Sequence, residues 1–319
     1  MIYILLLIII VIFIYYKTYI SNENTVEDVA LNESLNYNPE VLPDGKSIIE
    51  IMIVDGVPSL TSGPGDDFSN RGNTVFEFIK KTIETYNFKG SRRLIIGVED
   101  TYVNELGIMV FSKNKKSQKN TMIPDLYAMG EYHGSLNSID EKQLSEKHTM
   151  GIFAGASTGH TDPKYNERIL FSNSAIGNSH VKSYITSIVQ MEESKIEENF
   201  PSYRDFTSDS ISENEQKNYK YVISIDGNTT SWDRIPWVFR SNSILLKKRS
   251  DDVNWYYSFM KEDEHYLGFD DLQEAEHVIK NTSIGCLEKI NENSKKFVNS
   301  YLTLEKQMYY MIKVIELLR

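Results

Sequence analysis

Acidic, small and hydroxyl residues follow three apolar, strand-like segments of the sequence. Glu99-Asp100 follows RLIIGV, the small residues from Gly155 to Gly159 follow MGIFA, and Asp226-Gly227 follows VISI. Ligands of open α/β sheets bind beyond the carboxyl ends of the strands, where turn backbone and helix N-termini supply N–H donors. These three turns are therefore the first candidates for a functional site.

Two of the turns are suited to an anion. Gly155, Ser157 and Thr158 are small enough for backbone donors to approach a diphosphate closely, and Arg168 downstream could neutralise its charge. The other turn, Asp226-Gly227, opens into hydroxyl residues that include Ser231, and Arg234 lies close behind. Neither segment is a Walker loop or a dinucleotide fingerprint, because the required glycine and lysine spacing is missing.

The third turn offers a carboxylate. Asp100 ends a buried-type strand, where it could take a proton from a hydroxyl as a general base. Each motif is equally compatible with ordinary structure, since Asp-Gly is common turn chemistry and an aspartate after a strand often caps a helix. Spacing alone leaves both readings open.

Charge, histidine spacing and cysteine content exclude several classes of function. The chain has 319 residues and a net charge of −11, which disfavours nucleic acid as a partner. Its histidines show no HxH or HExxH spacing, so no catalytic zinc or other metal site is expected. A single cysteine, Cys286, excludes an internal disulfide framework.

The N-terminus reads as a membrane element. Met1 to Tyr16 is an unbroken apolar run, and continuing to residue 20 brings it close to the length that crosses a bilayer. A buried core helix is the alternative. We predict an uncleaved anchor over 1–20, followed over 21–46 by a stalk rich in Asn, Glu and Pro without periodicity.

The rest of the chain alternates strand-like and helix-like segments. In residues 47–148 these are strands at 48–54, 93–98 and 107–112, and an amphipathic helix at 74–86. Residues 149–300 contain strands at 150–157, 219–227 and 243–248, and a helix from Leu272 on; a final helix occupies 301–319. Such alternation predicts an α/β protein with parallel sheets, in two Rossmann-like domains that face a ligand cleft.

Longer stretches share an ordered set of motifs with one enzyme family. Tyr219 to Ile279 contains YKYVISIDGNTTSWDR, RSNSILLKK and NWYYSFMKEDEHYLGFDDLQEAEHVI. GIFAGASTG with NERILF, and RLIIGVED with MVFSKNK and IPDLY, add two further segments. Over residues 92–300 the order of these segments resembles glycosyltransferase family 90, which holds the Rumi-type protein O-glucosyltransferases and the fungal capsule-associated xylosyltransferases.

The resemblance implies a GT-B fold, with an acceptor domain at 47–148 and a nucleotide-sugar domain at 149–300. It implies inverting, metal-independent transfer of a glucose- or xylose-class sugar from a UDP-sugar to a hydroxyl of a protein or glycan, with no cofactor. By position, Asp100 matches the catalytic base, Arg168 and Arg234 match the arginines that hold the donor diphosphate, and Ser231 matches the hydroxyl beside the second arginine. Combined with the anchor, it implies a single-pass type II protein of the secretory pathway.

The sequence departs from the family pattern at three positions. Ala154 replaces the arginine of the family's Phe-Arg-Gly segment, Ala156 replaces the following serine, and Asp233 is an extra residue ahead of Arg234. A catalytically impaired, membrane-tethered nucleotide- or glycan-binding protein on the same fold is therefore the main alternative. A Mn²⁺-dependent transferase of the GT-A type and a purely structural protein are the others.

Overall fold

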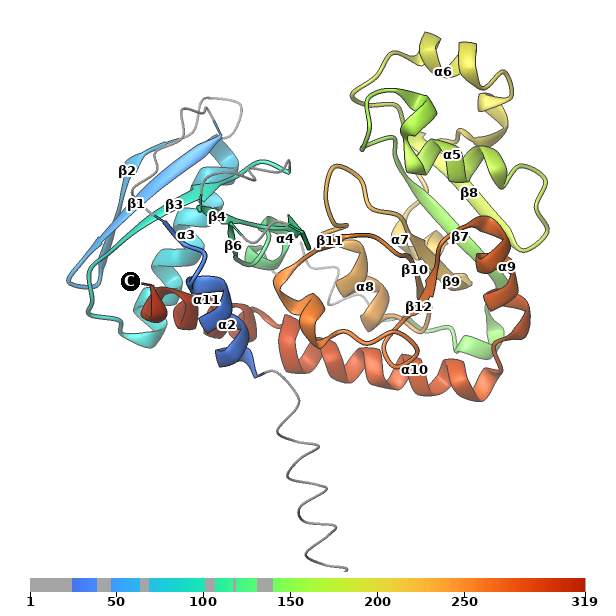
Figure 1. Ribbon diagram of the computed structural model, residues 1–319. Coiled ribbons are helices and arrows are strands. Elements are labelled where there is room, and N and C mark those ends of the chain that lie inside the picture. The colour runs from blue at the N-terminus through green and yellow to red at the C-terminus, as the bar shows by residue number, and fades with distance from the viewer. Residues whose placement is uncertain are drawn as a thin grey trace, which may run out of the picture.

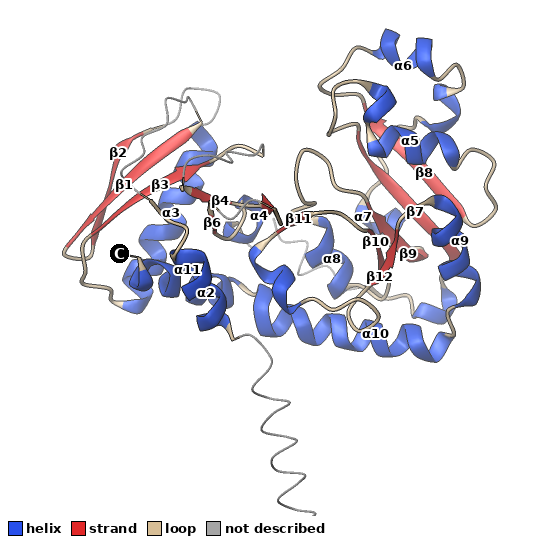
Figure 2. Cartoon of the chain, viewed as in Figure 1, coloured by secondary structure: helices blue, strands red, loops and turns tan. Residues whose placement is uncertain are grey.

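The computed structural model describes residues 25–38, 47–63, 69–100, 107–116, 119–130 and 140–318. These residues form two lobes, each built around a five-stranded sheet (Figure 1). Helices and strands follow one another in both lobes (Figure 2), which confirms the predicted α/β class. The predicted anchor over 1–20 lies outside the described residues. Within the described ranges, no helix combines the length and apolar character needed to cross a membrane.

The sheet of the first lobe is mixed, with the strand order β2-β1-β3-β4-β6. β3, β4 and β6 run parallel, whereas β1 is antiparallel to both β2 and β3, so the prediction of a parallel sheet is wrong for this part of the lobe. Asp55 and Gly56, with φ of 50° and 79°, form the tight turn between β1 and β2. Asp-Gly is typical of such hairpins because both turn residues need positive φ. The strands are β1 (Ile48–Val54), β2 (Val57–Ser62), β3 (Arg92–Gly97), β4 (Met109–Val110) and β6 (Thr121–Met122).

Helices from distant parts of the chain pack together beside this sheet (Figure 1). In α3, Val75, Ile79 and Ile83 recur at helical spacing and are buried. The predicted C-terminal helix is confirmed as α11, and it packs against α2, α3 and α4 of the first lobe although it follows the second lobe in sequence. The helices are α2 (Val26–Ser34), α3 (Ser69–Tyr86), α4 (Leu126–Met129) and α11 (Leu304–Leu317).

Helix α2 contradicts the prediction of a stalk over 21–46. It starts with a capping box between Thr25 and Asp28. Near its end, both carboxylate oxygens of Glu33 accept hydrogen bonds from Lys113 Nζ at 2.9 Å, and Oε2 accepts one from the backbone N–H of Met122 at 2.7 Å. Glu33 is only 3% exposed. Residues 25–38 therefore belong to the folded first lobe.

The sheet of the second lobe has the order β12-β10-β9-β7-β8, and all its pairings are parallel, as predicted. Its strands are β7 (His148–Ala156), β8 (Val181–Ser187), β9 (Tyr219–Ser224), β10 (Ile244–Lys248) and β12 (Leu267–Phe269). The helices are α5 (Glu167–Ser174), α6 (Glu193–Asn199), α7 (Glu213–Gln216), α8 (Arg234–Arg240), α9 (Leu272–Asn281) and α10 (Ile284–Phe297). A parallel sheet covered on both faces accounts for unbroken apolar strands such as VISI.

A continuous apolar core joins the lobes. It runs from the first sheet through α11 to the nearer face of the second sheet. At its centre, Trp255 of the turn η6 (Trp255–Phe259) stacks on Tyr310 of α11, with ring centroids 4.0 Å apart and planes at 10°. The indole N–H of Trp255 donates to Gln307 Oε1 at 3.0 Å. These contacts hold the two lobes in a defined arrangement.

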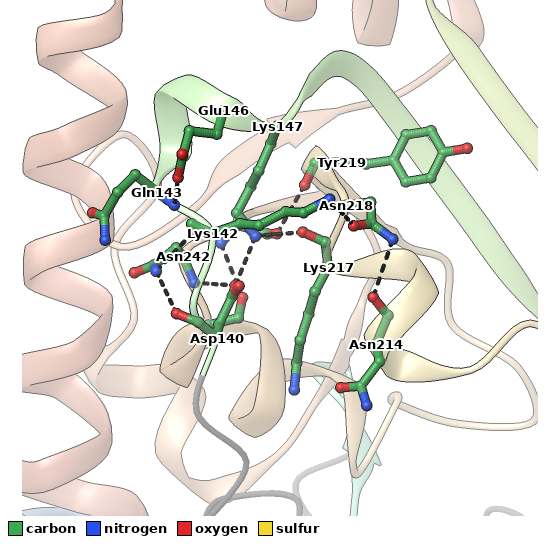
Figure 3. Close-up of polar contacts among 12 residues, drawn as sticks. Asp140, Lys142, Gln143, Glu146, Lys147, Asn214, Lys217, Asn218, Tyr219 and Asn242 are labelled. Carbon is green, nitrogen blue, oxygen red and sulfur yellow. Dashed lines mark hydrogen bonds and ion pairs between the residues drawn. The ribbon is translucent and has the colours of Figure 1, made fainter.

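The chain enters the second lobe through a buried polar cluster at the start of β7 (Figure 3). Lys147 Nζ donates to Asp140 Oδ2 at 2.6 Å, to Ser243 Oγ at 3.1 Å and to the carbonyl of Lys217. Asp140 Oδ2 also accepts from the backbone N–H of Asn242 at 2.8 Å. Burial lowers the pKa of Lys147, while the bond with Asp140 favours its charged form. The cluster fastens residues 140–148 to the second lobe, at the ends of the strands away from their carboxyl ends.

Candidate functional site

The carboxyl ends of β3, β7 and β9 and the start of α8 surround a cavity of about 300 Å³. Asp100 and Tyr127 line it from the first lobe, and the other lining residues come from the second, so the cavity lies between the lobes. Seven of the nine predicted site residues line this one cavity. The lining comprises Asp100, Tyr127, Gly155, Ala156, Thr158, Arg168, Gly227, Asn228, Thr229, Thr230, Ser231, Trp232, Asp233 and Arg234.

Arg234 joins β7 to β9 beyond the point where these strands pair directly. The strand pairing reaches Ile152 and Val222. Further along, Arg234 Nη2 donates to the carbonyl of Ala154 at 2.6 Å, and Nη1 donates to the carbonyl of Ile223 at 3.2 Å. The guanidinium group therefore links the two strands where their direct backbone pairing has ended.

Arg168 links the same two chain segments in the same way, through carbonyls two residues further along each of them. Its Nη1 donates to the carbonyl of Ala156 at 3.0 Å and to the Thr158 hydroxyl, and its Nε donates to the carbonyl of Ile225 at 3.1 Å. Within the described ranges, Nη2 of Arg168 makes no hydrogen bond to another group. This nitrogen is therefore available to a ligand.

The two arginines place buried positive charge on one wall of the cavity. Burial lowers the pKa of Arg168 to about 10, and the nearby charge of Arg234 adds to this effect. Burial also lowers the pKa of Arg234. Neither arginine forms an ion pair with any carboxylate of the described chain, although the charges of Asp226 and Asp233 act on Arg168 from further away. Two buried like charges without a paired anion are typical of a site that binds one.

Asp100 faces this wall from the first lobe. Its Oδ2 accepts a hydrogen bond from Asn228 Nδ2 at 3.2 Å. Its Oδ1 lies 3.8 Å from Arg71 Nη1, and its side chain is 40% exposed. The structure therefore brings the predicted base and the predicted diphosphate-binding arginines into the lining of one cavity.

The other two predicted residues do not line the cavity. Ser157 is fully buried, and its Oγ donates to the carbonyl of Val189 at 3.0 Å and accepts from the Val189 N–H at 2.8 Å. Asp226 Oδ1 accepts from the backbone N–H of Ser231 at 3.3 Å, and Oδ2 accepts from Lys247 Nζ at 3.0 Å. In the structure these two side chains shape the turns, and a direct contact of either with the donor stays a prediction.

Gly227 is required by close packing. A Cβ at this position would lie 2.5 Å from Thr158 Oγ1 and 3.0 Å from Arg168 Nη2. Real Cβ atoms do not come within 3.0 Å of other atoms, so a side chain here would displace Thr158 Oγ1, which accepts a hydrogen bond from Arg168. The Asp-Gly turn thus leaves space for the group that lines the cavity.

Seven lining residues are not among the predicted site residues, and Asn228, Trp232 and Tyr127 are three of them. Asn228 stands in the quoted DGNTTS motif, which by itself predicts a turn. Trp232 packs edge-on against Phe111, with ring centroids 5.3 Å apart, and brings an aromatic wall to the site. Tyr127 lies in the quoted IPDLY segment. Position in these motifs was the only available signal, because none of the three has a diagnostic spacing.

A larger cavity of about 500 Å³ lies between α2 and η6 and shares no described lining residue with the first. Lys247 and Ser250 line it, and both donate to Asp226 Oδ2, at 3.0 and 2.6 Å. Asp226 therefore stands in the wall between the two cavities. No predicted site residue lines the larger one.

Solved glycosyltransferase structures show distant similarity to the chain. One is the C-terminal domain of a glycosyl transferase group 1 family protein from Francisella tularensis, at 9% identity and a TM-score of 0.35 over 52% of this chain and 95% of that chain. A glycosyltransferase from Rickettsia africae is 10% identical, with a TM-score of 0.40 over 68% of this chain and 66% of that chain. The pneumococcal O-GlcNAc transferase, solved with UDP and GlcNAc, is 13% identical, with a TM-score of 0.33 over 63% of this chain and 41% of that chain.

No curated protein matches the sequence. The model of glycosyl transferase family 90 matches residues 129–317, which is more than half of the chain and includes both arginines and the turn between them. The chain therefore belongs to glycosyl transferase family 90.

Proposed function

We propose that this glycosyltransferase has a GT-B-like fold and transfers a sugar of the glucose or xylose class from a UDP-sugar to an acceptor hydroxyl. The transfer inverts the anomeric carbon and needs no metal ion. The observation that carries the proposal is the pair Arg168 and Arg234, buried without a paired carboxylate in the described chain, across one cavity from Asp100.

The donor diphosphate is placed against the second lobe. Arg168 Nη2 is free to donate to it, and Thr158 and Ser231, from the turns after β7 and β9, line the same cavity. Charge-assisted bonds from arginine to phosphate are about twice as strong as neutral ones, and burial strengthens them further. The arginines thus supply the positive charge that a bound cation supplies in metal-dependent transferases.

Asp100 acts as the general base. Its carboxylate accepts the proton of the acceptor hydroxyl while the new bond forms between that oxygen and the anomeric carbon. The bond from the anomeric carbon to the phosphate oxygen breaks on the opposite face of the sugar, and UDP departs with the electron pair. Arg168 and Arg234 stabilise the negative charge that develops on UDP. One displacement with one base gives inversion, since no enzyme nucleophile attacks the sugar.

A nucleotide-binding protein with impaired catalysis is the second candidate. Alanine at 154 and 156, in place of the family's arginine and serine, means one charge and one hydroxyl fewer in the segment that ends β7. Arg168 and Arg234 also use several of their donors on strand carbonyls. Such a protein would bind UDP and release none from any UDP-sugar.

The experiment is a panel of UDP-sugars assayed for UDP release, with and without protein and glycan acceptors and with EDTA. The proposal expects release from at least one donor that is stimulated by an acceptor and survives EDTA. UDP binding by calorimetry without any release supports the impaired protein. Loss of release in EDTA and recovery with Mn²⁺ would contradict the role given to the arginines.

The protein or glycan nature of the acceptor stays a prediction from the sequence. The same holds for attachment to a membrane through residues 1–20 and for a type II position in the secretory pathway.

A further inference from the structure

The side chain of Asn228 ties together the three turns that form the cavity. Its Nδ2 donates to Asp100 Oδ2 at 3.2 Å, after β3. Its Oδ1 accepts from the backbone N–H of Gly159 at 3.0 Å, after β7. Asn228 itself follows β9. One partly buried amide therefore links the first lobe to both anion-binding turns of the second.

The backbone determines which way the amide points. Gly159 N–H can only donate, so the amide oxygen must face it, and the amide nitrogen must face Asp100. The Asp100 carboxylate thus receives an N–H on Oδ2, while the Arg71 guanidinium lies near Oδ1. These two contacts restrict the rotation of the carboxylate, and a general base must be held within hydrogen-bond reach of the proton that it accepts.

We propose that Asn228 is a positioning residue that orients the Asp100 carboxylate across the gap between the lobes for the transfer step. This inference rests on the proposed role of Asp100 as the base. It adds that the base is organised by the donor-binding lobe, so that a displaced turn after β9 would also misplace the base.

Asn228 also lines the cavity, so a plain role in donor binding must be separated from positioning. Asn228→Asp does this, because it keeps an oxygen for Gly159 and sets a second carboxylate about 3 Å from Asp100. Two carboxylates at that distance do not both ionise readily, and one retains its proton to higher pH. We expect the acidic limb of the pH–rate profile to rise by about one pH unit or more, so that kcat measured on that limb falls about tenfold.

Gln190 offers a matched control. Its Oε1 also accepts from the Gly159 N–H, at 3.4 Å, and it makes no contact with Asp100. Gln190→Ala should leave the pH profile unchanged. Asn228→Ala should lower kcat at every pH while UDP affinity, measured by calorimetry, changes less than about threefold.

An unchanged pH profile in Asn228→Asp, or a loss confined to UDP affinity in both Asn228 variants, would overturn the inference. If Asn228→Asp does not fold, the split between kcat and UDP affinity in Asn228→Ala decides the question. The proposed function is tested separately by Asp100→Asn. Normal turnover in that variant would show that Asp100 is not the base, independently of any result for the Asn228 variants.

Discussion

Arg168 and Arg234 lie against the same aromatic ring, that of Phe153 in β7, with guanidinium carbons 5.7 and 5.3 Å from its centroid. An aromatic face attracts cations and partly replaces the water that the two charges lose on burial. Contact with the ring therefore lowers the free-energy cost of holding two like charges side by side without a ligand. The two charges in turn favour binding of an anion.

The first prediction concerns Arg168. Replacing it with Ala should weaken UDP binding about 10- to 100-fold, because a hydrogen bond to a charged group contributes about 1.5–3 kcal/mol. Calorimetry with UDP measures this. Arg204→Ala, which changes an arginine whose side chain is 75% exposed, is the matched control and should bind UDP normally. Unchanged affinity in Arg168→Ala would refute its place in the donor site.

A second prediction follows from the packing around Gly227. Gly227→Ala puts a Cβ 2.5 Å from Thr158 Oγ1 and 3.0 Å from Arg168 Nη2, so Thr158 must move and the arginine that it contacts should move with it. UDP affinity should fall about tenfold, since a displaced Arg168 loses a charged hydrogen bond to the ligand that contributes about 1.5–3 kcal/mol. Gly285→Ala, at a helical glycine with open space around its Cβ position, should leave affinity unchanged. Equal affinities in the two variants would mean that the Gly227 contact does not position Arg168.

Asp125 gives a prediction for pH. It is buried at the N-terminus of α4, where it accepts from the Ala128 N–H at 2.9 Å and from Asn254 Nδ2 of the other lobe at 3.2 Å. Burial raises the pKa of Asp125 to about 7, from a normal value of 3.8. Between these values the folded protein keeps a proton that the unfolded chain has lost, so the free energy of unfolding should fall as pH rises from about 4 to about 7.

The corresponding variant is Asp125→Asn, which cannot titrate. Over this pH range, the free energy of unfolding of the variant should fall by less than that of the unmodified protein, and the difference should be at most about 4 kcal/mol. Urea unfolding at pH 4.5, 5.5, 6.5 and 7.5 measures it. Asp205→Asn, at an exposed position, should reproduce the slope of the unmodified protein. A slope that is identical in all three proteins would show that Asp125 is ionised throughout.

The buried pair of Glu33 and Lys113 predicts that α2 contributes to stability. Lys113→Met leaves the Glu33 carboxylate buried without its cation, and breaking such a pair costs about 3–5 kcal/mol. Urea unfolding should show this loss, and adding Glu33→Gln should recover part of it. Lys116→Met breaks an exposed pair with Asp251 and should leave the midpoint unchanged. Equal midpoints for Lys113→Met and Lys116→Met would mean that α2 is not held by this pair.

The sequence predicted the second lobe better than the first, for a physical reason. Its strands are buried on both faces and therefore form unbroken apolar runs that end in polar turns, so strand and site could be recognised together. In the first lobe the antiparallel hairpin was missed, although Asp55-Gly56 between apolar strands is a strong hairpin signal. The alternation of helix-like and strand-like segments predicts parallel strands, whereas this local turn predicts an antiparallel pair.

Helix α2 was missed because its stability comes from partners distant in sequence. Its own residues show weak helical patterning, and a polar composition suggested a linker. Burial of Glu33 is possible only because Lys113 and the Met122 N–H meet it, 80 and 89 residues further along the chain. A two-residue capping box, Thr25 with Asp28, is the signal for this helix in the sequence.

In the site, residue types were predicted more reliably than their partners. Turn position brought Asp100, Arg168 and Arg234 together, and the extra Asp233 does not keep Arg234 from the cavity wall. The carbonyl of Ala154, where the family has an arginine, accepts from Arg234. Bonds of this kind depend on where two strands stop pairing, which sequence spacing does not reveal.

The most direct test of the account is to measure UDP binding and sugar transfer together in Asp100→Asn, with the donor that the panel identifies. The amide keeps the shape of the side chain and cannot accept the proton. We expect UDP affinity within about threefold of the unmodified protein and transfer reduced by about 10²- to 10⁴-fold, the usual contribution of a general base. Transfer at a near-normal rate with UDP still bound would contradict the assignment of Asp100 as the base.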